Sequence, residues 1–186
     1  MIKLRQLRAA KFKQLDDVAL SFPERGSVLI QGLNEAGKST LFESVFFALF
    51  GKGLVTEDNA GKLDDLINYQ SPRALVQLSF TTDGASFIVQ RGLNRGKANT
   101  ATLDVEYANG KRETVTNLTA VNRRIMDELG LDGEALLNSC FVEQKKLEKL
   151  ESMTAQQRRD TLLRLLNLDK LSLLEMQYKP ANADEY

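Results

Sequence analysis

The residues from Gly32 to Thr40 constrain this chain more than any other stretch. They read Gly-Leu-Asn-Glu-Ala-Gly-Lys-Ser-Thr and fit the phosphate-binding pattern G-x-x-x-x-G-K-[ST] at every position. Ser27–Gln31 before them contains a short apolar run typical of a buried strand, and Leu41–Phe50 after them is apolar enough for a packed helix. A strand, this loop and a helix form the context that the motif requires. The sequence therefore predicts a site for a nucleoside triphosphate and Mg²⁺.

Each residue type in this loop has a physical role. Gly32 and Gly37 permit backbone conformations that a β-carbon would block. The loop amides can then point at phosphate oxygens, together with the N-terminus of the following helix. We expect Lys38 to bridge the β- and γ-phosphates, Ser39 to place its hydroxyl on Mg²⁺ and Thr40 to reach the α-phosphate. The alternative is a glycine turn before a helix whose first turn carries a lysine by chance.

Composition excludes several kinds of chemistry. The 186 residues include 25 basic and 25 acidic side chains, so a generally basic surface does not exist, although a local patch can. Histidine is absent, which excludes His-dependent acid–base catalysis and His-ligated zinc. Cys140 has no second cysteine to pair with, and no apolar run is long enough to span a membrane. We therefore expect a cytoplasmic protein.

Hydrophobic periodicity predicts an antiparallel, β-rich chain. Apolar and polar residues alternate from Ile2 to about Ala10 and again over Val18–Phe22, which predicts two strands before the phosphate loop. Apolar spacing predicts a helix over 118–129, and a capping box at Thr154 followed by dense leucines predicts another to about Tyr178. Four further strand-like runs, separated by glycine turns, are 74–80, 86–92, 101–107 and 112–115.

The order of these features resembles the N-terminal half of the ABC-type ATPase head of SMC-like DNA-repair proteins, most closely the SbcC and Rad-fifty group. The resembling segments are the opening hairpin with Lys11-Phe12-Lys13, the phosphate loop and its helix, the strand Phe87–Arg91, and Phe141-Val142-Glu143-Gln144, which is similar to the Q-loop. The resemblance implies an α/β fold of the P-loop NTPase class. An antiparallel β-lobe would join a P-loop α/β core and end in the start of a coiled-coil helix.

The resemblance also implies domain boundaries. Residues 1–150 would form the half-head, with its β-rich lobe at 74–116 and its Q-loop near 144. Residues 151–179 would begin the coiled-coil arm, and residues 180–186 would be a tail.

The resemblance implies a set of site residues. Lys38 and Gln144 would be catalytic, and Ser39 and Gln144 would be metal ligands, because a glutamine oxygen can reach Mg²⁺ while its amide senses the γ-phosphate through a water. A polar residue in a charged loop is the alternative for Gln144. The nucleotide-binding residues would be Asn34, Glu35, Ala36, Gly37, Lys38, Ser39, Thr40 and Lys13.

Two of these residues depart from the family pattern. Glu35 stands where glycine is frequent, so its carboxylate must point away from the phosphates. Lys13 stands where arginine is frequent; a phosphate contact and a solvated turn lysine both remain open.

The resemblance implies an ATPase that couples ATP binding and hydrolysis to head dimerisation, DNA binding and control of a nuclease. Its cofactors would be ATP and Mg²⁺, and it would lie at the nucleoid. Its partners would be the C-terminal half of the same head, a second head, an SbcD-type nuclease and double-stranded DNA, with no membrane.

Several catalytic motifs of such heads are absent here. Met126-Asp127-Glu128 lies on a helical pattern rather than at the end of a buried strand, no two glycines are adjacent as a Leu-Ser-Gly-Gly signature needs, and the switch histidine is missing. We expect this chain to be an N-terminal fragment that hydrolyses ATP negligibly by itself.

Two other classes remain open: a self-contained P-loop kinase or GTPase, and a RecF-like or YhaN-like ATP-binding head with a scaffolding role. Basic residues in the predicted hairpins could contact DNA or be ordinary solvated charges. These residues are Arg91, Arg95, Lys97, Lys111 and Arg112.

Overall fold

The computed structural model describes residues 2–54, 63–130, 133, 136–137 and 154–156. The chain divides into two compact units, Met1–Gly130 and Leu131–Tyr186. Every strand and helix discussed below belongs to the first unit. The expected boundary near residue 150, Gln144 and all but the first residues of the helix from Thr154 lie outside the described residues, so they stay predictions.

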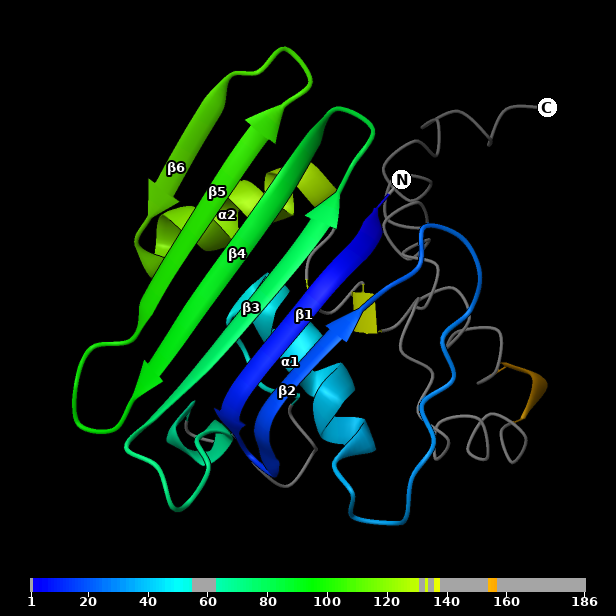
Figure 1. Ribbon diagram of the computed structural model, residues 1–186, viewed down its shortest axis with the longest axis vertical. Helices are drawn as coiled ribbons and strands as arrows, with labels where there is room; N and C mark the ends of the chain where they lie inside the picture. Colours follow the sequence, from blue (N-terminus) through cyan, green and yellow to red (C-terminus); the bar gives the residue numbers. More distant parts are fainter. Residues whose placement is uncertain (1, 55–62, 131–132, 134–135, 138–153, 157–186) are drawn as a thin grey trace, which may run out of the picture. The chain divides into compact units, whose positions relative to one another are not determined.

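The first unit is built on one antiparallel sheet (Figure 1). Its spatial order is β2-β1-β3-β4-β5-β6, so the opening hairpin joins the later meander through the pairing of β1 with β3. All six strands were predicted from alternation, with ends that differ by a few residues. They are β1 (Lys3–Phe12), β2 (Leu15–Ser21), β3 (Arg73–Thr81), β4 (Ala85–Asn94), β5 (Thr100–Tyr107) and β6 (Arg112–Thr116).

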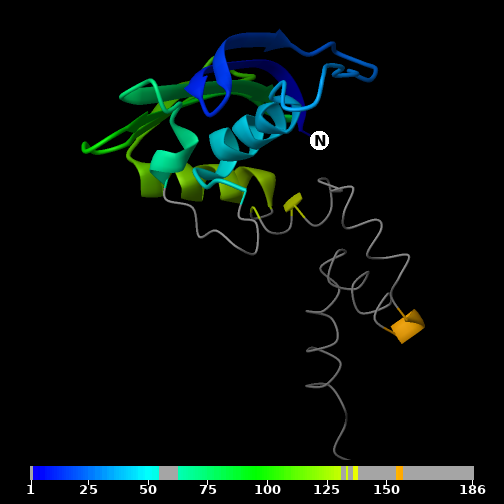
Figure 2. The same ribbon diagram turned by 90° about the horizontal axis from the view of Figure 1, so that it is seen from below.

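Helices α1 (Lys38–Phe50) and α2 (Leu118–Leu129) lie on the same face of this sheet, as Figure 2 shows from below. The core lies between them and the inward-facing residues of the sheet, chiefly those of β1, β3, β4 and β5. On β3, alternate residues are buried, because successive side chains of a strand point to opposite faces. Val121 and Ile125 are one helical turn apart on α2 and both are fully buried.

A glycine follows the last residue of each of the two helices. Gly51 adopts a left-handed conformation with φ 66° and its amide donates to Phe47 O, which ends α1. Leu63–Leu66 forms a short 3₁₀ helix. None of the helices in the described part of the chain has the length and apolar character needed to cross a membrane.

The strand expected before the phosphate loop is wrong as a local element. Ser27–Gln31 has no strand conformation, and two of its apolar side chains are solvent-exposed: Val28 is 42% exposed and Leu29 is 79% exposed. A strand requires a neighbour that accepts and donates its backbone hydrogen bonds. Among the described residues no strand lies beside this segment, so the apolar run has nothing to pair with.

Candidate phosphate-binding site

The phosphate-loop motif leads directly into α1. Gly37 is the N-cap residue with φ 86°, a conformation that suits glycine, and the helix begins at Lys38. No side chain caps this end of the helix. The first amides of a helix have no partner within it, so they remain available to an external acceptor. An uncapped N-terminus behind a glycine loop is well suited to a phosphate group.

The Lys38 ammonium lies against the loop rather than away from it. Its Nζ donates to the carbonyl oxygens of Gly32 at 2.7 Å and Leu33 at 2.6 Å. An ammonium has three N–H donors, so one remains for a phosphate oxygen in this position. The structure therefore holds the Lys38 ammonium at the loop, and its contact with a phosphate stays a prediction.

The turn between β1 and β2 packs on the first turn of α1. Thr40 Oγ1 donates to Gln14 Oε1 at 3.3 Å, and a β-carbon added at Gly37 would lie 3.1 Å from Leu15 Cδ2. Thr40 was expected at the α-phosphate; its hydroxyl is engaged by Gln14 in this structure. The opening hairpin is therefore part of the site.

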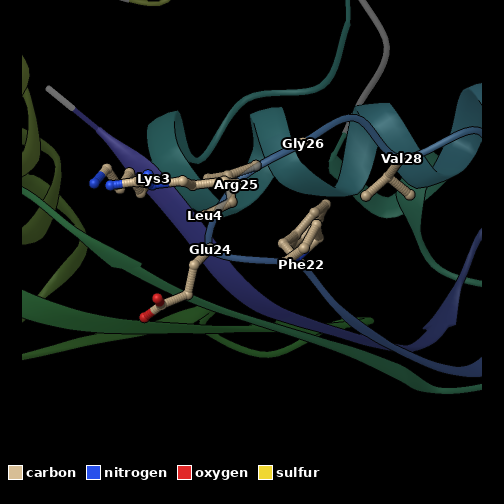
Figure 3. A pocket seen from close by; sticks show the side chains of 8 residues that line it. Lys3, Leu4, Phe22, Glu24, Arg25, Gly26 and Val28 are labelled. Atoms are coloured by element: carbon tan, nitrogen blue, oxygen red, sulfur yellow. The ribbon is translucent and has the colours of Figure 1, made fainter.

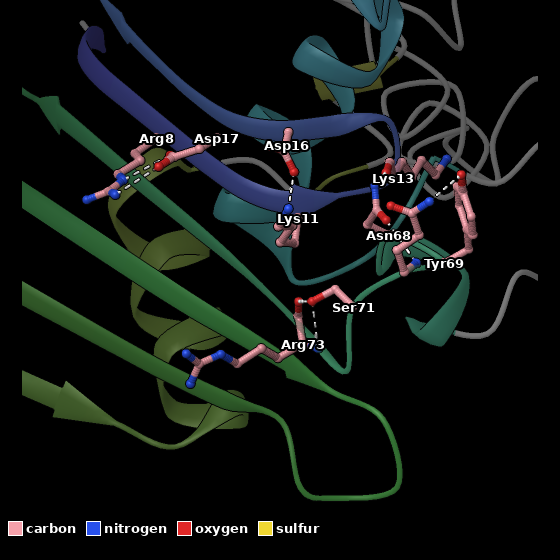
Figure 4. Close-up of polar contacts among 10 residues, drawn as sticks. Arg8, Lys11, Lys13, Asp16, Asp17, Asn68, Tyr69, Ser71 and Arg73 are labelled. Atoms are coloured by element: carbon pink, nitrogen blue, oxygen red, sulfur yellow. Dashed lines mark hydrogen bonds and ion pairs between the residues drawn. The ribbon is translucent and has the colours of Figure 1, made fainter.

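Lys13 is held in the same turn by both its backbone and its side chain. Its amide donates to Leu66 O at 2.8 Å, and Asn68 Nδ2 donates to its carbonyl at 2.7 Å (Figure 4). Its ammonium pairs with the Glu43 carboxylate on α1. Lys13 is thus a partnered residue beside the phosphate-loop helix, and its contact with phosphate stays a prediction.

Glu35 lies at the loop surface in an unusual backbone conformation. Its φ is 66°, in the left-handed region that glycine adopts without strain, and its side chain is exposed. The neighbouring Ala36 amide donates to Leu33 O at 3.3 Å, which closes the loop into a turn. The strained position explains why a glycine would suit this place.

The residues present fit a magnesium–triphosphate group. Among the described residues no cluster of three or more acidic, cysteine or histidine side chains forms a metal cage. Mg²⁺ in nucleotide sites takes few protein ligands and relies on the phosphates and water. Ser39, exposed in the first turn of α1, is the described hydroxyl that would hold it.

Sequence reasoning missed three residues and misread a fourth. Gln14 gave no signal; Glu43 is the one acidic residue in the apolar run of α1, and that isolation could have singled it out. The residue misread is Arg91, offered above as a DNA contact or a solvated charge. The third missed residue, Asn122 of α2, has a buried Oδ1 without a hydrogen-bond partner among the described residues.

Arg91 is buried against the C-terminal end of α1, so it cannot contact DNA. It is 1% exposed, and its Nε and Nη2 donate to Ala48 O at 2.6 Å and Leu49 O at 2.9 Å. Burial lowers the pKa of Arg91 to about 10, which leaves it protonated at neutral pH. Arg95 also donates to backbone carbonyls, those of Ile67 and Ser71.

A separate hollow lies where β1 begins and where β2 is followed by the exposed loop (Figure 3). Its lining combines apolar side chains such as Phe22 with the charged residues Lys3, Glu24 and Arg25. Glu24 pairs with Arg5 at 3.2 Å. No phosphate-loop residue lines it, so it is distinct from the candidate site.

Comparison with known proteins identifies similar chains. A family model described as an AAA domain matches residues 6–186. A "DNA double-strand break repair Rad50 ATPase" of Methanocaldococcus jannaschii is 32% identical over 90% of this chain and 16% of its own length. The protein of the same description from Halobacterium salinarum is 31% identical over 91% of this chain and 19% of its own. The chain thus spans less than a fifth of the length of either relative.

Solved structures share the fold. A structure described under "ATP-driven dimerization and DNA stimulated activation of SMC ATPases" superposes with a TM-score of 0.60 at 21% identity, covering 86% of this chain and 96% of that one. An SMC head bound to a winged-helix domain of ScpA gives a TM-score of 0.50 at 18% identity, covering 87% of this chain and 54% of that one. At these identities the likeness establishes the fold alone.

Proposed function

Because this chain belongs to the AAA domain family and corresponds to the N-terminal half of a Rad50-type head, we propose that it supplies the ATP-binding half of an SMC-like ATPase in DNA double-strand-break repair. The observation that supports this most is the uncapped N-terminus of α1 behind the glycine loop, with the Lys38 ammonium held at the loop carbonyls. This combination supplies amide donors and a fixed cation to an anionic ligand.

The loop residues would each act on the bound nucleotide. The amides of Asn34, Glu35, Ala36 and Gly37 and the ammonium of Lys38 would hold the phosphate oxygens, with Lys13 and Thr40 at their side. Ser39 and Gln144 would hold Mg²⁺, which neutralises the charge that develops during phosphoryl transfer. Gln144 would also sense the γ-phosphate position.

The rest of the head would come from polypeptide beyond this chain. The exposed apolar segment supports this, because Leu29 is 79% and Leu33 is 85% exposed, and exposed apolar runs beside unpaired backbone mark surfaces that a partner covers. We propose that the C-terminal half of the head pairs with Ser27–Gln31 and turns it into the strand that its sequence favours.

Through that completed head, ATP binding would drive dimerisation with a second head, and hydrolysis would control DNA binding and a partner nuclease. The chain alone would hydrolyse ATP negligibly, because the Walker B carboxylates and the signature glycines are not in its sequence.

Equilibrium binding of Mg-ATP to the complete protein tests the proposal. Lys38→Ala should weaken binding by about tenfold or more, the usual loss for a hydrogen-bonded charge. Lys97→Ala, which removes an exposed lysine from a distant hairpin, serves as the matched control and should leave binding unchanged. Unchanged binding in Lys38→Ala would rule the site out. An ATPase rate for the isolated chain equal to that of the complete head would refute the half-head assignment.

A further inference from the structure

The Glu43 carboxylate is buried within the helix that follows the phosphate loop. Its side chain is only 7% exposed. One oxygen, Oε1, accepts the backbone amide of Leu54 at 3.2 Å, and the other pairs with the Lys13 ammonium. A buried carboxylate that loses its only cationic partner is strongly destabilising, because the charge stays desolvated without compensation. Glu43 therefore holds its lysine strongly.

The backbone of Lys13 leaves the side chain little choice of direction. Its φ is 47°, and both its amide and its carbonyl are bonded to the segment that contains Leu66 and Asn68. Figure 4 shows Lys13 beside Asn68 at the end of the β1–β2 hairpin. With the backbone fixed on one side and Glu43 on the other, the ammonium is held at a defined place.

The hairpin that carries Lys13 also contacts the first turn of α1. Gln14, the next residue, contacts Thr40 in the first turn of the helix. Thr40 and Glu43 are three residues apart and so share a helix face, about one turn or 5 Å apart along the axis. Lys13 remains 33% exposed, and the carboxylate cannot use all three of its N–H donors. A donor of Lys13 is thus left for a further, anionic acceptor.

We infer that Glu43 is a positioning residue for nucleotide binding: it orients the Lys13 ammonium so that Lys13 contacts a phosphate of the nucleotide while remaining paired. This inference rests on the proposed function and deepens it. Release of Lys13 to the phosphates is the competing arrangement, and the buried, then unpaired carboxylate opposes it.

Binding of Mg-ATP to the complete protein tests the inference through Glu43→Gln, Lys13→Met and the double variant. Glu43→Gln keeps the shape and the Leu54 contact but loses the charge. Each single variant should weaken ATP binding about tenfold. This is the lower end of the loss that follows when the group orienting a ligating side chain is removed. The double variant should bind no more weakly than Lys13→Met, because Glu43 acts only through that lysine.

Asp16→Asn is the matched control, since Asp16 pairs with Lys11 in the same hairpin and is exposed. It should leave ATP binding unchanged. Unchanged or tighter binding by Glu43→Gln overturns the inference, as does further weakening by Glu43→Gln in the Lys13→Met background.

Two further arms keep the result interpretable. If Glu43→Gln does not fold, Glu43→Asp replaces it: a shorter carboxylate should weaken ATP binding several-fold, and unchanged affinity overturns the inference. The Lys38→Ala arm separates the two proposals. If Lys38→Ala abolishes binding while the Glu43 variants leave it intact, the inference fails and the proposed function stands.

Discussion

Gly51 and Arg91 meet so closely that a side chain at position 51 has no room. A β-carbon added to Gly51 would lie 2.8 Å from Arg91 Nη1 and 3.2 Å from Asn122 Oδ1. Gly51 ends α1, Arg91 lies on β4, and Asn122 lies on α2. The C-terminal end of α1 therefore packs between β4 and α2, at a point where a residue larger than glycine does not fit without a shift.

Gly51→Ala should destabilise the protein by about 2 to 4 kcal/mol, the sum of left-handed strain and overpacking. Gly96→Ala provides the matched control, because Gly96 has nearly the same φ, 67°, with nothing within 4 Å of its would-be β-carbon. It should lose only about 1 kcal/mol from strain. Equal losses of unfolding free energy in the two variants, measured by denaturant unfolding, would show that Arg91 moves aside at no energetic cost.

Arg91→Met should destabilise the protein by about 2 to 4 kcal/mol, because the carbonyls of Ala48 and Leu49 lose their charged donor. Arg112→Met, which removes an exposed pair with Glu106, should change the free energy of unfolding by less than about 1 kcal/mol. Denaturant titration of both variants checks this, and a similar loss in the two would contradict the anchoring role.

The difference in the free energy of unfolding between wild type and Arg91→Met should not vary with pH around neutrality. Burial lowers the pKa of Arg91 from its usual value to about 10, so below pH 10 the guanidinium is charged in both the folded and the unfolded state. Only as pH rises through about 10 does the folded state begin to lose the proton, which removes part of the burial penalty and raises stability. A slope between roughly pH 6 and 9 would mean that another group titrates with Arg91.

Asn117 should tolerate glycine better than alanine. It has φ 86°, and its Oδ1 accepts the Thr119 amide at 2.9 Å to cap α2. Asn117→Ala loses the cap and keeps the strain, for a loss of about 1 to 3 kcal/mol, whereas Asn117→Gly loses the cap but removes the strain and should be within about 1 kcal/mol of wild type. Thermal unfolding of the two variants compares them directly, and the reverse order would contradict the strain argument.

Glu35→Gly should stabilise the complete protein by about 1 kcal/mol, because the left-handed φ of 66° suits glycine. It should also strengthen Mg-ATP binding, because it removes the charge beside the phosphates. Glu35→Gln separates the two effects: it removes the charge beside the phosphates and keeps the strain, so affinity should rise while stability stays unchanged. Calorimetric binding and denaturant unfolding measure them independently. Weaker binding by both variants would mean that the carboxylate takes part in the site.

Alternation and turn chemistry were sufficient to predict the six strands and both helices. For α2, the apolar spacing of Val121, Ile125 and Leu129 predicted a helix over the residues where the structure has it. The phosphate loop was equally readable, since Gly37 and Lys38 occupy fixed places in a short motif. The expectation failed at Ser27–Gln31, where apolar content favours a strand but no neighbouring strand exists among the described residues.

The amino-acid sequence by itself determined the elements and the phosphate-loop motif, because turns, caps and alternating side chains act between residues close together in the chain. Only the tertiary structure decided that Lys13 meets Glu43, that Gln14 meets Thr40 and that Arg91 is buried against the end of α1. Such pairings join residues far apart in sequence. They depend on which strand lies beside which and on which helix covers the sheet, and no local pattern of side chains encodes that choice.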